Sequence, residues 1–220
     1  MPHPPPFRVI TYIDGFNLYY GMRAAGFRRY YWLDLVALAR NLTKPNQTLV
    51  ATKYFTARIA GPRPADSARK KAALEEKRKR QTHYLDALQT LPDFLMYEGH
   101  YLPKDRRCRQ CNARWTDHEE KMTDVNIATQ LLVDGFHDAF DTAIIISGDS
   151  DLTPPTLALR EHYPEKRIIV AFPPKRHSVQ LKRAAHASFT LGRATLKRSL
   201  LPQQVIQPNG HILRQPRRWQ

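Results

Sequence analysis

The chain has 220 residues, the size of one medium domain, of which 42% are hydrophobic and 25% charged, so disordered and fibrous proteins are excluded. Lys and Arg number 35 against 20 Asp and Glu, and the net charge of +15 indicates a polyanionic partner, with nucleic acid ahead of anionic lipid or of a merely soluble basic surface. No apolar run approaches the roughly 18–20 residues of a membrane span, and the Pro-rich start lacks the features of a signal peptide. With only two cysteines, we expect a cytoplasmic protein without membrane contact.

Strand-like and helix-like patterns alternate along the chain. Short apolar and β-branched runs predict five strands, at residues 8–13, 48–59, 94–102, 141–147 and 167–172. Helical spacing or dense charge predicts helices between them, at 31–42, 67–89 (capped by Asp66 or Ser67), 123–136, 152–161 and 179–191. The apolar stripe expected on the 123–136 helix is Val125, Ala128, Leu131 and Leu132. This alternation predicts an α/β fold with a mainly parallel sheet covered by helices on both faces.

The chain divides into a central domain and two flanking segments. Residues 1–7 are a Pro-rich lead, 8–195 are the domain, and 196–220 are a basic tail that we expect to be a loosely ordered arm. Within the domain, residues 103–118 are predicted to be a basic, irregular insertion that holds both cysteines.

Carboxylates follow two of the predicted strands. Asp14 ends the first strand, Asp149 and Asp151 follow the fourth, and Asp124 lies in the first turn of the helix before it. Ligands of open α/β sheets bind beyond the carboxyl ends of the strands, so these four side chains could converge. Taken singly, each is better explained as a helix cap or turn former. Together they indicate a Mg²⁺ or Mn²⁺ site, because a divalent cation relieves their repulsion.

Three sequence blocks carry a resemblance to a known family. They are IDGFNL at 13–18, EKMTDVNIA at 120–128 and ISGDSDL at 146–152. In this order they resemble the signature blocks of the NYN domain, and more narrowly of its bacterial LabA-like branch in the PIN-like nuclease superfamily. The resemblance covers residues 8 to 191 and implies a PIN-like three-layer α/β/α sandwich that cleaves RNA with a metal ion.

The resemblance also implies roles for particular side chains. Asp14, Asp124 and Asp149 would be ligands of Mg²⁺ or Mn²⁺, and Asp151 would help to orient the attacking water. Asn17 would bind substrate or fix the first carboxylate by a hydrogen bond, and Ser147 would line the site. In-line attack by metal-activated water would leave a 5′-phosphate and a 3′-hydroxyl.

The two cysteines form a C-x-x-C pair, which is half of a zinc site. Cys108 and Cys111 could bind a structural Zn²⁺ together with His100 and His118. Two ordinary free thiols explain the pair equally well. A thioredoxin-like redox motif is disfavoured because the pair does not open a helix after a strand.

Further basic and aromatic residues are candidate contacts for RNA. Lys175 and Arg176 follow the fifth strand at the same edge as the acids and could hold a phosphate, or form a rigid turn. The basic run from Arg69 to Arg80 is either an RNA contact or a solvated helix face. Aromatic residues beyond the first block either stack on unpaired bases or belong to the core: Tyr19, Tyr20, Tyr30, Tyr31 and Trp32.

Two rival functions stay open beside an endoribonuclease. One is an RNA-binding or regulatory module of the same fold without useful turnover. The other is a phosphatase of the haloacid dehalogenase class, suggested by the acids at 148–151. That class needs D-x-D at the first strand end, and Phe16 stands where the second Asp would be. The choice of RNA over DNA and the presence of a homodimer stay open as well.

Overall fold

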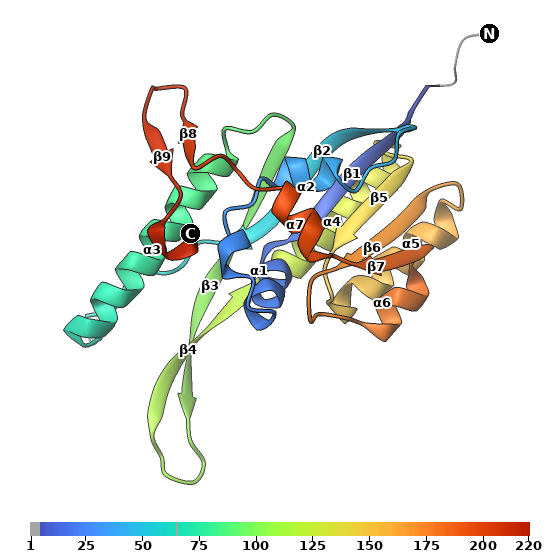
Figure 1. Cartoon of the computed structure of the whole chain (residues 1–220). Helices are drawn as coiled ribbons and strands as arrows, with labels where there is room; N and C mark the ends of the chain where they lie inside the picture. Colours follow the sequence, from blue (N-terminus) through green and yellow to red (C-terminus); the bar gives the residue numbers. More distant parts are fainter. Residues whose placement is uncertain (1–4, 65) are drawn as a thin grey trace.

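A computed structural model describes residues 5–64 and 66–220, with backbone only for 101–105 and 114–121. It confirms the predicted α/β fold, built on a seven-stranded sheet of order β4-β3-β2-β1-β5-β6-β7 (Figure 1). Six strands run parallel to one another: β1 (Phe7–Asp14), β2 (Gln47–Ala57), β3 (Phe94–Arg107), β5 (Thr142–Ile146), β6 (Arg167–Phe172) and β7 (Ala187–Thr190). The strand β4 (Arg114–Lys121) is antiparallel to β3.

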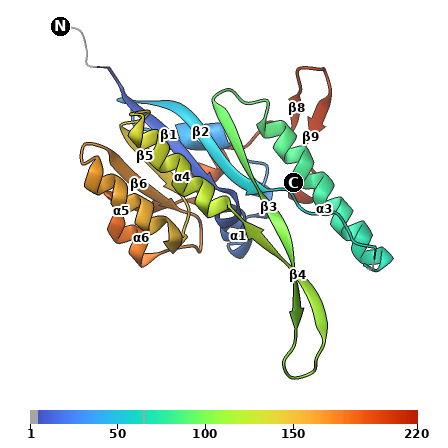
Figure 2. The same ribbon diagram turned by 180° about the vertical axis from the view of Figure 1, so that it is seen from behind.

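Helices cover both faces of the sheet and give three layers (Figures 1 and 2). One face carries α1 (Gly15–Ala24), α2 (Leu35–Arg40), α3 (Ala68–Leu88) and α7 (Arg193–Arg198). The other carries α4 (Thr123–Phe136), α5 (Thr153–His162) and α6 (Val179–Ala184). Strand alternation separates two cores, since Val9 and Ile13 of β1 pack with the first helices, whereas Ile10 and Tyr12 pack with the second.

Polar side chains begin three helices of the first layer. Asp14 caps α1, Asp34 caps α2 and Ser67 caps α3, each by accepting a backbone N–H three residues later. Asp34 therefore starts α2 later than the predicted helix at 31–42. Ser67, rather than Asp66, is the cap of α3, and both had been candidates.

A buried ionic cluster anchors α4 on the sheet. Lys53 of β2 lies 2.7 Å from Asp134 of α4, with their side chains 7% and 12% exposed. The Tyr12 hydroxyl donates to the same Asp134 carboxylate, and Lys53 also donates to Gln130. Burial first, and then the charge of Asp134, raise the pKa of Tyr12 well above its usual value, so the phenol stays neutral.

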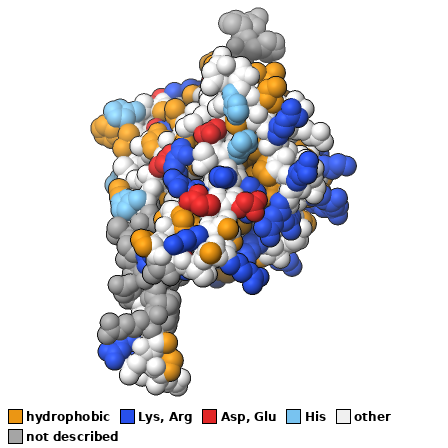
Figure 3. All heavy atoms as spheres, turned by 90° about the vertical axis from the view of Figure 1, so that its left-hand side faces the viewer, with side chains coloured by type: hydrophobic (Ala, Val, Ile, Leu, Met, Phe, Trp, Pro, Cys, Tyr) orange, Lys and Arg blue, Asp and Glu red, His pale blue; other side chains and the backbone are white. Residues whose placement is uncertain are grey.

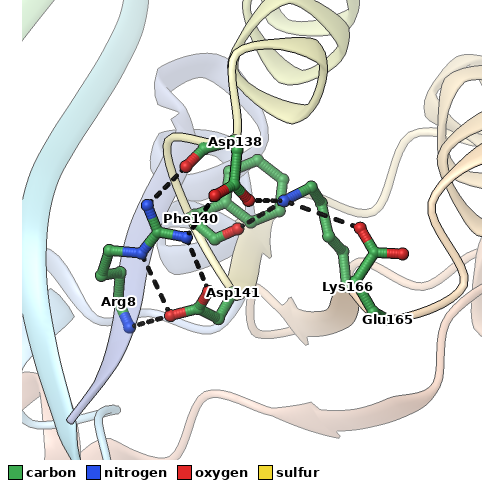
Figure 4. A network of polar contacts seen from close by, with 6 residues as sticks. All are labelled: Arg8, Asp138, Phe140, Asp141, Glu165 and Lys166. Atoms are coloured by element: carbon green, nitrogen blue, oxygen red, sulfur yellow. Dashed lines mark hydrogen bonds and ion pairs between the residues drawn. The ribbon is translucent and has the colours of Figure 1, made fainter. Parts of the chain in front are cut away.

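A second ionic network joins the amino ends of β1, β5 and β6 (Figure 4). The Arg8 guanidinium lies 2.8 Å from Asp141 and 3.0 Å from Asp138. Lys166 pairs with Asp138 and donates to the carbonyl of Phe140. These contacts hold the pKa of both Asp138 and Asp141 below the usual range, mainly through hydrogen bonds from Lys166 and Arg8 respectively.

The prediction that residues 103–118 are irregular is wrong. These residues extend β3 and form β4, an antiparallel hairpin that projects from the sheet (Figure 1). The sequence of this segment predicts a strand only weakly, because it is polar and charged throughout and does not alternate apolar with polar residues. Backbone pairing from His100 with Lys121 to Arg107 with Arg114 overrides that composition.

The predicted loose arm at 196–220 is also wrong. It contains the end of α7, the hairpin of β8 (Gln204–Ile206) and β9 (Ile212–Arg214), and the 3₁₀ turn η3 (Arg217–Trp219). Leu196, Leu201 and Leu213 are buried, and the Trp219 ring packs against Trp32 and Tyr84. A few apolar residues spaced among basic ones are sufficient to dock the segment on α3 and the core.

Two helix predictions need correction in detail. The buried residues of α4 include Ile127 and Leu131, whereas Val125 and Leu132 of the predicted stripe are 64% and 38% exposed. The predicted helix at 179–191 ends at Ala184, because Ala185 turns to extended backbone and the next residues pair with β6 as β7.

Candidate active site

The carboxyl ends of β1 and β5 bring Asp14 and Ser147 together. Ile13 pairs with Ile146 in the sheet, so the next residue of each strand lies at the same edge. The Ser147 hydroxyl donates to Oδ2 of Asp14 at 2.8 Å, and both residues are buried. Burial raises the pKa of Asp14 and nearby Asp149 adds to the rise, while the donors Asn17 and Ser147 oppose it.

The side chain of Asn17 links these two strand ends. Its Nδ2 donates to Oδ2 of Asp14 at 2.7 Å, and its Oδ1 accepts from the backbone N–H of Gly148 at 3.2 Å. The backbone N–H of Asn17 donates to Oδ1 of Asp14 at 2.9 Å, as the cap of α1 requires. The hydrogen bond to the first carboxylate was one of two roles predicted for Asn17, and contact with substrate stays a prediction.

Asp149 and Asp151 lie on the turn that follows β5. Oδ1 of Asp149 caps the 3₁₀ helix η2 (Ser150–Leu152) by accepting the backbone N–H of Asp151 at 3.0 Å. The backbone N–H of Asp149 donates to the Ser147 hydroxyl at 3.0 Å. Asp149 is half-buried and Asp151 exposed, so the second carboxylate lies at the solvent side of the group.

Asp124 approaches the same place from α4. The residue before that helix, Met122, has a left-handed backbone with φ of 78°, which is uncommon for a side chain of its size. The pKa of Asp124 is raised to about 6, first by burial and then by the charges of Asp14, Asp149 and Asp151. The structure therefore brings Asp14, Asp149 and Asp151 within electrostatic reach of Asp124.

The chemistry of this donor set fits a hard divalent cation. Carboxylate oxygens are the ligands that Mg²⁺ and Mn²⁺ prefer, and a bound ion would relieve the repulsion between Asp124 and the other three acids. Among residues with described side chains, no three acidic, histidine or cysteine groups already close around a single ion position. Metal ligation by Asp14, Asp124 and Asp149 accordingly stays a prediction.

The loop between β6 and α6 packs against the acidic end of the sheet. A Cβ at Gly148 would lie 2.9 Å from Cβ of Arg176, and one at Gly21 would lie 2.6 Å from the carbonyl of Pro174. Close contact with two glycines thus places the loop against both β5 and α1. Arg176 lies 6.0 Å from the Tyr20 ring centre, and exposed Lys175 has a left-handed backbone with φ of 59°.

Comparison of the sequence with models of protein families gives a match over this domain. The NYN domain family matches residues 8–192, which is most of the chain. The chain belongs to the NYN domain family. NYN domains are part of the PIN-like nuclease superfamily, and the sheet order, helix layers and acidic edge agree with that membership.

Two similar proteins put this NYN domain in context. One is the 6-hydroxy-3-succinoylpyridine 3-monooxygenase HspA of Pseudomonas putida (strain DSM 28022 / S16), 31% identical over 192 residues. The match covers 71% of this chain and only 57% of that protein. The other is a solved structure of VPA0982, a protein of unknown function from Vibrio parahaemolyticus RIMD 2210633. Its TM-score is 0.53 at 19% identity, covering 91% of this chain and all of that one, which supports the fold alone.

In the hairpin of this NYN domain the predicted zinc ligands Cys108, Cys111, His100 and His118 are spread along β3, β4 and the turn between them, and zinc binding by these four residues stays a prediction. His118 pairs with Pro103, five residues from Cys108, and His100 lies eight residues from Cys108. At the strand rise these separations are about 16 and 26 Å, whereas zinc ligands lie about 2 Å from the metal. The described groups include no such cluster, and the side chain of His118 lies outside them. The pKa of the Cys108 thiol is lowered, first by the backbone N–H groups of Cys111 and Gln110.

The aromatic residues after the first block divide between core and surface. Tyr30 and Trp32 are 2% and 0% exposed and belong to the core, as the simpler alternative predicted. Tyr19, Tyr20 and Tyr31 instead line a cavity of about 740 Å³ between α1 and α3. Lys77 and Arg80 of the basic run line it too, together with Arg218 and Trp219, which sequence reasoning missed.

None of the helices in the described part of the chain has the length and apolarity of a membrane span. Lys and Arg side chains cover much of one side of the face in Figure 3, with a smaller acidic group near its middle. Part of the basic excess of the sequence therefore lies on the surface of this face.

Proposed function

We propose that this NYN domain is a metal-dependent endoribonuclease. The observation that carries the proposal is the juxtaposition of Asp14 and Asp149 at the neighbouring carboxyl ends of β1 and β5, where both residues are hydrogen-bonded to Ser147. The charges of Asp14, Asp149 and Asp151 also act on Asp124. Four acids gathered in a protein of net charge +15 are costly without a cation and fit phosphodiester hydrolysis. The three sequence blocks favour the LabA-like branch, and the low cysteine content favours a reducing, cytoplasmic setting.

Each side chain has a distinct task in this mechanism. Asp14, Asp124 and Asp149 would hold Mg²⁺ or Mn²⁺, which when bound supplies Lewis acidity at the phosphate and water of lowered pKa. Asp151, at the solvent side, orients the attacking water and accepts its proton. Asn17 and Ser147 hold the Asp14 carboxylate in place through the hydrogen bonds described above.

Cations beside the acids would bind the flanking phosphates. Lys175 and Arg176 are exposed on the loop that packs against Gly148, at the carboxyl ends of the strands. Both would act through charge, so RNA affinity should fall steeply with salt.

The test is incubation of labelled mixed-sequence RNA with the protein in Mn²⁺, in Mg²⁺ and in EDTA. We expect cleavage in metal only, giving 5′-phosphate and 3′-hydroxyl ends. Cyclic phosphate ends would contradict attack by water. RNA retention without cleavage would instead support a binding module of the same fold.

A second candidate function comes from the Pseudomonas putida relative, whose name describes oxygenation of a substituted pyridine. The observation that favours a small aromatic ligand is the aromatic lining of the cavity between α1 and α3. The test is oxygen uptake with 6-hydroxy-3-succinoylpyridine and a reduced nicotinamide as electron donor. Uptake that requires the pyridine would support this candidate over the nuclease, and its absence would remove it.

A further inference from the structure

A cavity of about 740 Å³ lies next to the acidic edge, on the α1 and α3 side of the sheet. Its walls are α1, α3 and the turn η3, and Tyr54 and Thr56 of β2 contribute to the lining. Gly15 and Phe16, which directly follow Asp14, line it as well. The cavity wall therefore includes the two residues that come directly after Asp14 in the chain.

The charge of the lining has one sign. Five lining residues are cationic and none is Asp or Glu: Arg23, Arg28, Lys77, Arg80 and Arg218. Arg80 pairs with Glu76 at 2.8 Å, and for the other four no carboxylate lies within ion-pair distance among the described side chains. The positive charge left in the cavity favours an anionic ligand.

The neighbouring cations also disfavour one another. The pKa of Lys77 is lowered, first by burial and then by Arg23 and Arg80. Because a bound anion would relieve this repulsion, the arrangement parallels that of the four acids at the other end of α1.

Aromatic rings form much of the remaining wall. The ring centres of Tyr19 and Tyr31 are 5.1 Å apart, and the Trp219 ring lies 5.9 Å from both Tyr31 and Tyr84. Tyr20 is 38% exposed. Burial raises the pKa of Tyr31, and raises that of Tyr84 still further, so these phenols add no negative charge at neutral pH. Partly exposed rings of this kind stack on nucleic acid bases.

The helix α1 connects the cavity to the acids. Asp14 caps its first turn and Arg23 lies nine residues later, about 14 Å along the helix axis. Arg176, on the loop between β6 and α6, lies over the Tyr20 ring at 6.0 Å. A chain that crosses the carboxylates can therefore continue past Tyr20 toward the cavity.

We propose that this cavity binds one nucleotide of a single-stranded chain, with its base stacked on the tyrosines and its phosphate against Lys77 and Arg23. The inference rests on the proposed nuclease function and makes it specific for unpaired RNA, because a base in a duplex cannot enter. A nucleotide of a longer chain fits better than a small carboxylic acid because five cations line the cavity, and Arg176, which packs against Gly148, lies over Tyr20 of the cavity wall.

The test is calorimetric titration in EDTA with adenosine 5′-monophosphate, adenosine and ribose 5-phosphate. We expect the nucleotide to bind at least tenfold more tightly than either fragment. K77Q should weaken binding about tenfold, whereas K79Q, an exposed lysine of the same helix outside the cavity lining, should change it less than twofold.

Several outcomes would overturn the inference. They are absence of nucleotide binding, equal affinity in K77Q and K79Q, or tighter binding of benzoate or 6-hydroxy-3-succinoylpyridine than of the nucleotide. Cleavage of single-stranded RNA without nucleotide binding would refute the cavity and leave the nuclease. Nucleotide binding without any cleavage would refute the nuclease and leave the cavity as a nucleotide site.

Discussion

Nδ2 of Asn17 donates a hydrogen bond to Oδ2 of Asp14 at 2.7 Å. The same carboxylate oxygen accepts from the Ser147 hydroxyl, and Asn17 in turn accepts from the backbone of Gly148. These hydrogen bonds hold the Asp14 carboxylate in place and oppose the rise in its pKa that burial causes. They also join β1 to the turn after β5. It gives Asn17 a structural reason to follow Asp14 by three residues.

Replacing Asn17 with Ala should impair both stability and cleavage. Asp14 loses a donor and the Gly148 N–H loses its acceptor, which should lower the free energy of unfolding by about 1–3 kcal/mol. The catalytic rate should fall more than the RNA affinity, because the carboxylate rather than the substrate is displaced. Urea unfolding and separate kcat and KM measurements check this, and an unchanged rate in a stable variant would contradict it.

Asp124 should make the metal-free protein less stable as the pH rises. Its folded pKa of about 6 exceeds the usual value of 3.8, so its proton stabilises the folded state at low pH. That contribution is lost as pH rises through about 6. Relative to D124N, the unmodified protein should therefore lose stability between pH 4 and 7 in EDTA, and recover it with Mn²⁺.

Unfolding curves of both proteins in EDTA measure this difference, with E161Q as a control. Glu161 is an exposed acid of α5. A difference between D124N and the unmodified protein that does not vary with pH would show that the four acids are not coupled.

Removing Asp134 should destabilise the fold. D134A leaves Lys53 buried without its carboxylate and Tyr12 without its acceptor, a change that typically costs about 3–5 kcal/mol. Chemical denaturation measures the loss. The double variant in which Lys53 is also replaced, by Met, should recover part of it, and no recovery would show that the ion pair is not the cause.

The network at the amino ends of the strands should fail in acid. Because Arg8 and Lys166 hold the pKa of Asp141 and Asp138 below the usual range, their stabilisation is present above about pH 4 and is lost as pH falls further. The urea midpoint should drop between pH 5 and 3. R8Q should drop less over that range, and an equal drop in both would contradict the assignment.

The sequence predicted the fold class and the acidic edge because both depend on local patterns. Buried strands such as Thr142–Ile146 are continuous apolar runs, and each of the four acids stands next to a strand or helix boundary. The parallel pairing of β1 with β5 then brings Asp14 and Ser147 together. The alternation of strands and helices along the chain already indicated parallel strands, whose carboxyl ends meet at one end of the sheet.

Features that depend on tertiary contact were not predictable. Trp219 packs on Trp32 from almost 190 residues away, so the basic composition around it gave no sign of docking. Val125 was wrongly predicted to belong to the buried stripe of α4, because helical periodicity does not show which apolar residues face the sheet. The cavity joins α1, α3 and the final turn, and three such distant segments leave no shared motif.

The most direct test of metal-dependent cleavage at the carboxylates is single-turnover cutting of labelled single-stranded RNA in Mn²⁺ by the unmodified protein, D149N and E161Q. We predict that D149N loses at least about a hundredfold in rate while its RNA affinity and melting temperature hold, and that E161Q behaves like the unmodified protein. Equal cleavage by D149N, or cleavage that persists in EDTA, would contradict hydrolysis at this acidic site.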